Sequence, residues 1–272
     1  MEEYGAGELV SATNIHDALT RGALDVAANC WLWNTGTIPE ASIFWIPMMY
    51  ENAGQEAAVY WEVQRPIADK IYREKFNQTI QSILYNAPQI MWTKKPVQKM
   101  EDYKGMKVRA PGGITTKFFE LLGASVVSMT APEALTALQS GALDGITYST
   151  GTVIAYKLTE TTPNCILPGP QWAHVEIHWN LNVWNSLPPD IQKTIEEYSR
   201  YVNYHSGTVK MPQVDADWTT TVEKMGAKFY RLPPAETARF KAKAVESWDW
   251  YAQQSADCRR LLEETKKFLE IK

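Results

Sequence analysis

The alternation of apolar and polar positions is most regular between residues 104 and 149. Short apolar runs, typical of buried strands, alternate there with segments of helical spacing. Thr130 and Glu133 have the spacing of a capping box, and Gly123 and Gly141 stand where glycine commonly ends a helix. The pattern predicts a β-α-β-α-β unit and therefore a parallel sheet. The predicted strands are 106–110, 125–129 and 143–148, and the predicted helices are 115–122 and 132–140.

The rest of the chain follows the same two periodicities with fewer clear boundaries. A helical pattern that starts at Pro189 continues toward Glu223, which predicts one unusually long helix. Further helices are predicted at 14–21, 55–76 with a bend near Pro66, 234–255 and 259–269. Further strands are predicted at 24–33, 79–85, 89–93, 174–183 and 228–232.

One tetrapeptide, Gly-Ala-Leu-Asp, occurs at residues 22–25 and again at 141–144. Each copy follows a short helical run and precedes an apolar segment, so each ends a helix and starts a strand. The copies are too far apart for a solenoid repeat. They predict two lobes of similar α/β construction.

Composition narrows the class of protein. The 272 residues carry a net charge of −4 without a basic block, which argues against a nucleic-acid partner. No apolar run approaches the length of a membrane span, and the first residues do not form a signal peptide. Three separated cysteines give no zinc pattern. Eleven tryptophans favour aromatic packing or a pocket for a ring-bearing ligand.

Arg109 is the strongest candidate for a functional side chain. It ends a predicted parallel strand just before the turn Gly112-Gly113 and a helix N-terminus, where open α/β sheets bind ligands. Helix amides and a guanidinium fork both suit a carboxylate. The alternative is a surface arginine in an ordinary ion pair. The glycine patterns of dinucleotide and phosphate loops are absent from the sequence.

A second candidate site lies at His174, Glu176 and His178, which would share one face of a strand. Two imidazoles and a carboxylate are metal ligands, so a metal-dependent enzyme is the alternative function. The three side chains spread along roughly 13 Å of backbone, which disfavours convergence on one ion without a bulge. A polar strand edge is the other reading of the same pattern.

The motifs around Arg109 resemble the solute-binding proteins of tripartite ATP-independent periplasmic (TRAP) transporters. The similarity keeps its order and spacing over nearly the whole chain. It rests on residues 5–9, 22–25, 95–96, 102–113, 122–125, 133, 137–139, 141–145, 180, 184, 187–188, 190 and 192.

The resemblance implies a type II periplasmic-binding-protein fold, in which two α/β lobes are joined by crossing strands and a long helix. Residues 1–87 with 177–215 would form lobe I, and residues 88–176 with 216–272 would form lobe II. Relatives begin with a signal peptide, a strand, a helix and a second strand, and the present sequence starts where that second strand ends. The N-terminal part of lobe I is therefore expected to be missing from this sequence.

The resemblance also implies the function. Such a protein is not an enzyme and needs no cofactor or metal. It captures an organic acid between its lobes in the periplasm and delivers it to the membrane subunits of the transporter, as a monomer or a dimer.

The resemblance also assigns binding roles to individual residues of this sequence. Arg109 would clamp the carboxylate with the amides of Gly112 and Gly113. Tyr148 and Gln89 would be hydrogen-bond partners, and Gln89 in place of a second arginine argues against sialic acid. Thr147 replaces a metal-binding glutamate of some keto-acid binders. Trp33 and Trp172 would supply apolar faces, and Asn180 completes the predicted set. The tryptophan content and Tyr148 favour an aromatic or other ring-bearing acid.

Overall fold

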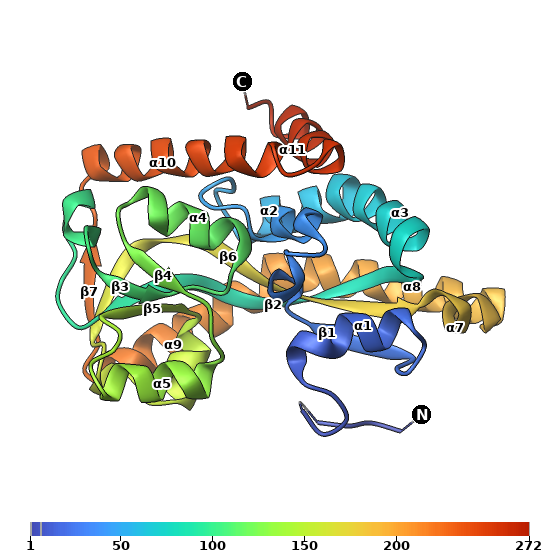
Figure 1. The fold of residues 1–272 in the computed structure, drawn as a ribbon, viewed down its shortest axis with the longest axis horizontal. Helices are drawn as coiled ribbons and strands as arrows, with labels where there is room; N and C mark the ends of the chain where they lie inside the picture. The colour runs from blue at the N-terminus through green and yellow to red at the C-terminus, as the bar shows by residue number, and fades with distance from the viewer. Residues whose placement is uncertain (1, 6, 272) are drawn as a thin grey trace.

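One mixed sheet runs through the whole molecule and organises both lobes (Figure 1). In this computed structural model the described residues are 2–5 and 7–271, without the side chains of residues 84–87 and 173. The strand order is β1-β6-β2-β5-β3-β4, and β7 pairs with β6 outside that path. The strands are β1 (Val26–Asn29), β2 (Gln78–Thr93), β3 (Lys107–Arg109), β4 (Ser125–Val127), β5 (Gly145–Tyr148), β6 (Asn164–Asn180) and β7 (Lys228–Arg231).

The predicted β-α-β-α-β unit is confirmed. β3 lies between β4 and β5 and pairs with both in parallel. Thr130 and Glu133 form the capping box of α5, with Thr130 N donating to Glu133 Oε2 at 2.8 Å. This unit forms the core of lobe II. Its helices are α4 (Gly113–Leu121), α5 (Ala131–Gln139) and α6 (Thr150–Ala155).

Two long antiparallel strands, β2 and β6, cross between the lobes. The start of β2 pairs with the end of β6 in lobe I, next to β1, while the end of β2 pairs with β5 in lobe II. Two separate strands were predicted, at 79–85 and 89–93, and the strand that is β6 was predicted to start only at 174. Both predictions are corrected: the backbone stays in the sheet through irregularities in register near Asn86 and Gln89, so β2 and β6 are each continuous.

The predicted strand 24–33 is also corrected. Only Val26–Asn29 is β1, and the chain then turns into the short helix η2 (Trp31–Asn34). Trp31 is buried there, with its ring stacked on His178 and its Nε1 donating to the carbonyl of Glu176 at 3.3 Å. The apolar run therefore fills the core of lobe I as a compact turn instead of extending the sheet.

Lobe I surrounds its end of β2 and β6 with short helices (Figure 1). The helix predicted over 55–76 changes type at the π-helical turn η4, which is followed directly by α3 with Pro66 in its first turn. The helical elements are η1 (Ala12–Asn14), α1 (Ile15–Thr20), η3 (Pro39–Trp45), α2 (Ala53–Val59), η4 (Tyr60–Gln64), α3 (Arg65–Phe76) and α7 (Leu181–Ser186).

The predicted long helix is confirmed as α8 (Pro189–His205), η7 (Ser206–Lys210) and α9 (Met211–Lys224), which follow one another without a break. It approaches both lobes closely. A Cβ on Gly207 would lie 2.8 Å from the carbonyl oxygen of Ala53 in lobe I. A Cβ on Gly151 of lobe II would lie 2.6 Å from the ring of Trp218. The helix is therefore a second bridge beside the crossing strands.

The C-terminal helices α10 (Pro234–Ala252) and α11 (Ala256–Phe268) cross the molecule along its upper edge in Figure 1. α10 starts over α4 of lobe II. The predicted division places 216–272 in that lobe and stays a prediction, while α11 also contacts lobe I. Asp257 pairs with Lys75 at 2.8 Å, and Thr265 accepts a hydrogen bond from Gln64 at 3.3 Å.

The apolar core has two parts, which the sheet separates in lobe II. The larger part extends from lobe I to α4 and α10 and includes Phe118 and Phe240. The smaller part lies against α5 and α9 and includes Ile90 and Tyr148. None of the described helices is long and apolar enough to cross a membrane.

Candidate functional site

Arg109 ends β3, and only 2% of its surface is exposed. Its Nε donates to the carbonyl oxygen of Met129 at 2.8 Å, and its Nη1 donates to the carbonyl oxygen of Thr147 at 3.0 Å. Met129 follows β4 and Thr147 lies in β5, so the strands on both sides of β3 hold the guanidinium. The strand ends thus place a fixed cation at the carboxyl edge of the parallel sheet.

The guanidinium retains unused donors. Nη2 donates to no atom of the described residues, and no acidic side chain among them pairs with Arg109. Burial lowers the pKa of Arg109, yet a guanidinium remains a cation at neutral pH. A buried cation is normally paired. Its electrostatic partner is therefore expected to come from outside the chain.

Tyr148 covers one face of this cation. Arg109 Cζ lies 4.1 Å from the centroid of the Tyr148 ring, within the range of a cation–π interaction. Burial raises the pKa of the phenol to about 12, so the hydroxyl keeps its proton. That hydroxyl is enclosed and has no hydrogen-bond partner among the described residues. Buried hydroxyls usually have one, so the Tyr148 hydroxyl is a second unused polar group beside Arg109.

Lobe I closes directly onto the turn that follows Arg109. Gly113 has φ +52°, and a Cβ there would lie 2.6 Å from Ser42 Oγ and 2.8 Å from Leu32 Cδ2. Gly112 has φ +118°, and its Cβ would lie 3.1 Å from the carbonyl oxygen of Leu32. Both glycines are therefore required by backbone conformation and by the close approach of η2 and η3.

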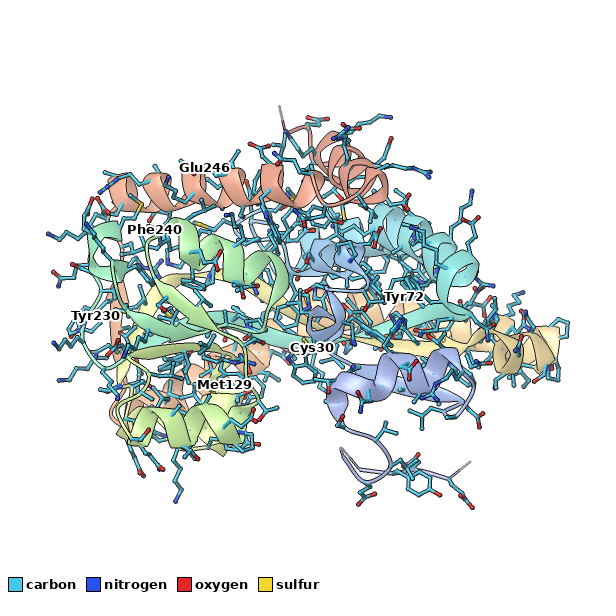
Figure 2. All side chains as sticks on the ribbon, in the orientation of Figure 1. Cys30, Tyr72, Met129, Tyr230, Phe240 and Glu246 are labelled. Atoms are coloured by element: carbon cyan, nitrogen blue, oxygen red, sulfur yellow. The ribbon has the colours of Figure 1, made fainter. Side chains whose placement is uncertain are left out.

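Cys30 brings the first strand of lobe I to the same place. It follows β1 directly, and its thiol and Arg109 are close enough to influence each other's ionisation. Burial raises the pKa of the thiol to about 12, with Arg109 opposing that shift. Figure 2 labels Cys30 near the centre of the molecule and Met129 on the lower side of lobe II. The surroundings of Arg109 thus include residues of both lobes.

Three further predicted residues adjoin this centre. Thr147 is fully buried, and its Oγ1 donates to the carbonyl oxygen of Arg109 at 3.4 Å. Trp33 is half-buried in η2, and its amide donates to the carbonyl of Cys30 at 3.3 Å. Gln89 is buried on β2, next to Ile90, whose backbone pairs with Tyr148. Their direct contact with a ligand stays a prediction.

Two predicted residues are not brought into these surroundings of Arg109, and a ligand contact for them stays a prediction. Trp172 lines a separate groove under α10 that includes neither Arg109 nor Tyr148. Asn180 ends β6 at its lobe I end, where its Oδ1 accepts from the amides of Asn182 and Val183 and caps α7. Its Nδ2 donates to the carbonyl of Leu19 at 2.8 Å. Asn180 thus organises a helix start and is not brought to Arg109.

Sequence reasoning missed Cys30 and Met129. Their positions at strand ends could have identified them. Cys30 directly follows the apolar run that forms β1, and Met129 lies two residues after the run that forms β4. Strand ends are where an α/β sheet presents its ligand site. Met129 contributes a backbone oxygen, which any residue type could supply, so its identity carried no information.

The second candidate cluster, on β6, is buried in lobe I. His174 Nε2 lies 2.6 Å from Glu56 Oε1, and His178 Nδ1 lies 3.1 Å from Gln78 Oε1. Burial raises the pKa of Glu176 to about 7, with the nearby His174 opposing that shift. Within the described part of the chain, no group of three His, Cys, Asp or Glu side chains could hold a metal ion. The geometry therefore gives the metal-enzyme alternative no support.

Comparison with known protein families identifies the family of this chain. The profile of the DctP family, described as bacterial extracellular solute-binding protein, family 7, matches residues 1–254. The chain belongs to this family. The resemblance read from the sequence is thereby confirmed, and the family consists of binding proteins of transport systems.

Individual relatives of the chain are also solute-binding proteins. A solute-binding protein of Albidiferax ferrireducens is 24% identical over 267 residues, which cover 96% of this chain and 78% of that protein. A monocarboxylate 2-oxoacid-binding periplasmic protein of Nostoc is 25% identical over 276 residues, covering 92% of this chain and 74% of that protein.

Solved structures confirm the two-lobed binding-protein fold. The periplasmic ectoine-binding protein of Halomonas elongata superposes with a TM-score of 0.88 at 18% identity, over 98% of this chain and 88% of that chain. A Bordetella pertussis extracytoplasmic solute receptor that binds pyroglutamic acid superposes with a TM-score of 0.85 at 18% identity, over 95% of this chain and 85% of that chain.

Proposed function

We propose that this protein binds one small organic acid through its carboxylate at Arg109 and presents it to the membrane subunits of a TRAP transporter. The observation that carries the proposal is the buried guanidinium of Arg109, which has unused donors and no acidic partner among the described residues. A carboxylate would complete its hydrogen bonding and neutralise its charge.

The surroundings favour a ligand with a single acidic group. The nearest ionisable neighbours that affect Arg109 are Tyr148 and Cys30, and both are kept neutral by burial. Among the described residues, the groups that act on the ionisation of Arg109 include no second cation, which supports a ligand with one carboxylate. The Tyr148 hydroxyl can bond a carbonyl or hydroxyl on the same ligand.

Solved relatives support a compact acid. Their bound ligands include pyroglutamic acid, malonate and orotic acid. Pyroglutamate and orotate each combine a carboxylate with a polar ring. The ring of Tyr148 and the half-buried Trp33 provide aromatic surface for a flat ligand of that kind.

Enclosure between the lobes makes the ion pair strong. The contact of Gly113 with Leu32 and Ser42 keeps water from that side of the turn. Coulomb attraction increases as water is excluded. A ligand that adds contacts only when the lobes meet shifts the population toward this closed arrangement. A closed, loaded receptor in the periplasm is what membrane subunits would recognise.

The test is a thermal-shift screen against keto acids, cyclic amino-acid derivatives, aromatic acids and dicarboxylates, followed by calorimetry of each hit. Arg109→Ala is compared with Arg260→Ala, which removes an exposed arginine of α11. We expect at least one monocarboxylate to bind wild type and Arg260→Ala equally and Arg109→Ala much more weakly. Binding that survives Arg109→Ala unchanged would refute the clamp.

A further inference from the structure

A second hollow has a lining that includes neither Arg109 nor Tyr148. It is a groove of about 660 Å³, within the usual range of small-molecule sites. Its walls come from the segment 46–50 of lobe I, the stretch of β6 at 168–172, and the start of α10. In Figure 2, Phe240 on α10 lies above the sheet, whereas Met129, which holds Arg109, lies below it.

The groove is largely apolar. Met48, Met49 and Trp172 line it together with two prolines of β6 and Leu232. Methionine adapts its shape to different partners, and tryptophan offers a flat surface. Beneath this surface a void of about 10 Å³ leads toward Phe118 and Phe240, and it shares Met48 and Leu232 with the groove.

Its charged groups are of one sign. Arg231 and Lys241 line the groove, and no acidic side chain does. Arg231 is exposed, and neither residue forms an ion pair within the described part of the chain. Lys241 Nζ donates to the carbonyl oxygen of Met48, and it also lies 5.0 Å from the centroid of the Trp248 ring. The ammonium is therefore fixed at the wall, where it forms no ion pair with a described residue, although the charge of Glu51 acts on it from outside the lining.

We propose that this groove is a second binding site, for an amphipathic anion that has an apolar body and one acidic group. The apolar body would lie against Met48, Met49 and Trp172. The acidic group would face Arg231 and Lys241. The site is separate from Arg109 and does not depend on the function proposed for it.

The position of the groove gives such a ligand a structural effect. Met48 N donates to the carbonyl of Pro170 at 2.6 Å, which joins the lobe I wall to β6. Lys241 joins the same wall to α10. A molecule bound here would contact lobe I, a crossing strand and the helix that starts over lobe II. It would therefore favour the lobe arrangement that keeps these walls together.

The test uses anilinonaphthalene sulfonate, an anion with an aromatic body whose fluorescence rises in apolar sites. We expect saturable binding to the folded wild-type protein, with one site per chain, and displacement by octanoate but not by octanol. Arg231→Gln combined with Lys241→Met should weaken binding roughly tenfold or more, because the anion loses both counter-ions.

Two pairs of variants separate the groove from other sites. Ala238→Trp fills the groove and should abolish binding, whereas Ala242→Trp places the same ring outside the groove on α10 and should not. Lys243→Gln removes a cation of α10 that is not in the lining and should also bind normally. Arg109→Ala should leave dye binding intact.

The proposal is overturned if wild type does not bind the dye, if the groove variants bind as well as wild type, or if Arg109→Ala alone removes binding. Circular dichroism of each variant accompanies the titration. If Ala238→Trp does not fold, the charge variants and octanoate competition still decide the matter.

Discussion

Arg109 and Tyr148 form a stacked pair, with Arg109 Cζ 4.1 Å from the centroid of the Tyr148 ring. Two backbone carbonyls hold the edge of the same guanidinium. The cation is therefore oriented before a ligand arrives, which reduces the entropy lost on binding.

Arg109→Lys is expected to weaken binding of the organic acid by roughly 2 kcal/mol or more, although the charge is retained. An ammonium cannot bond the Met129 and Thr147 carbonyls and also present a fork to a carboxylate. Calorimetry measures the loss. Arg260→Lys on the exposed side of α11 is the matched control. Equal affinity of Arg109→Lys and wild type would show that charge alone holds the ligand.

Tyr148→Phe separates stability from binding. The Tyr148 hydroxyl has no partner among the described residues, so its removal should leave the melting temperature of the free protein unchanged or higher. The affinity for the acid should fall by about 1 kcal/mol, the usual worth of one hydrogen bond. Differential scanning fluorimetry and calorimetry give the two values. A lower melting temperature with unchanged affinity would mean that the hydroxyl serves the fold.

The sequence predicted the parts of this molecule that local pattern encodes. The strands and helices between 106 and 148 each carry their own periodicity and end signals, and Arg109 follows from its place at a strand end. The long helix after Pro189 was predicted for the same reason. Periodicity indicates which residues are buried, but it does not indicate which other elements they pack against.

Non-local packing could not be predicted from the sequence. Trp172 lines the groove under α10, and the irregular register that carries β6 through residues 168–170 has no local sequence signal. The division into lobes placed α11 in lobe II, and no local pattern indicated its contacts with Lys75 and Gln64. The stacking of Tyr148 on Arg109 depends on β5 lying beside β3, which no local pattern contains.

Gly113→Ala tests the contact between the lobes. The new Cβ would meet Ser42 Oγ at 2.6 Å and Leu32 Cδ2 at 2.8 Å, at a φ of +52°. Gly141→Ala is the control, since Gly141 has a φ of +80° but nothing within 4 Å of its Cβ position. Both variants should lose about 1 kcal/mol of stability from the backbone.

Only Gly113→Ala should also lower ligand affinity, because the closed arrangement is disfavoured. Small-angle scattering should then show a more open protein for that variant than for Gly141→Ala. Equal affinity in the two variants would mean that this contact does not control closure.

Glu176 makes stability depend on pH in a defined direction. It is fully buried on β6, where burial raises its pKa from 4.5 to about 7. The folded state therefore holds this proton more tightly than the unfolded state does. The penalty appears as pH rises above the unfolded pKa and is complete above about pH 7, where it amounts to roughly 3 kcal/mol. The neighbouring pair Glu56 and His174 also has raised pKa values, so it acts in the same direction.

Glu176→Gln removes this titration while keeping the shape of the side chain. His16 and His178 have lowered pKa values and destabilise the fold as pH falls, so the wild-type profile alone mixes opposing effects. The difference between variant and wild type isolates Glu176.

In urea unfolding, the stability of Glu176→Gln relative to wild type should rise between about pH 5 and about pH 8. Glu197→Gln, at an exposed ion pair of α8, is the control substitution of the same type. A constant difference for Glu176→Gln would mean that this carboxyl group is ionised throughout, with a counter-charge that stabilises it in the core.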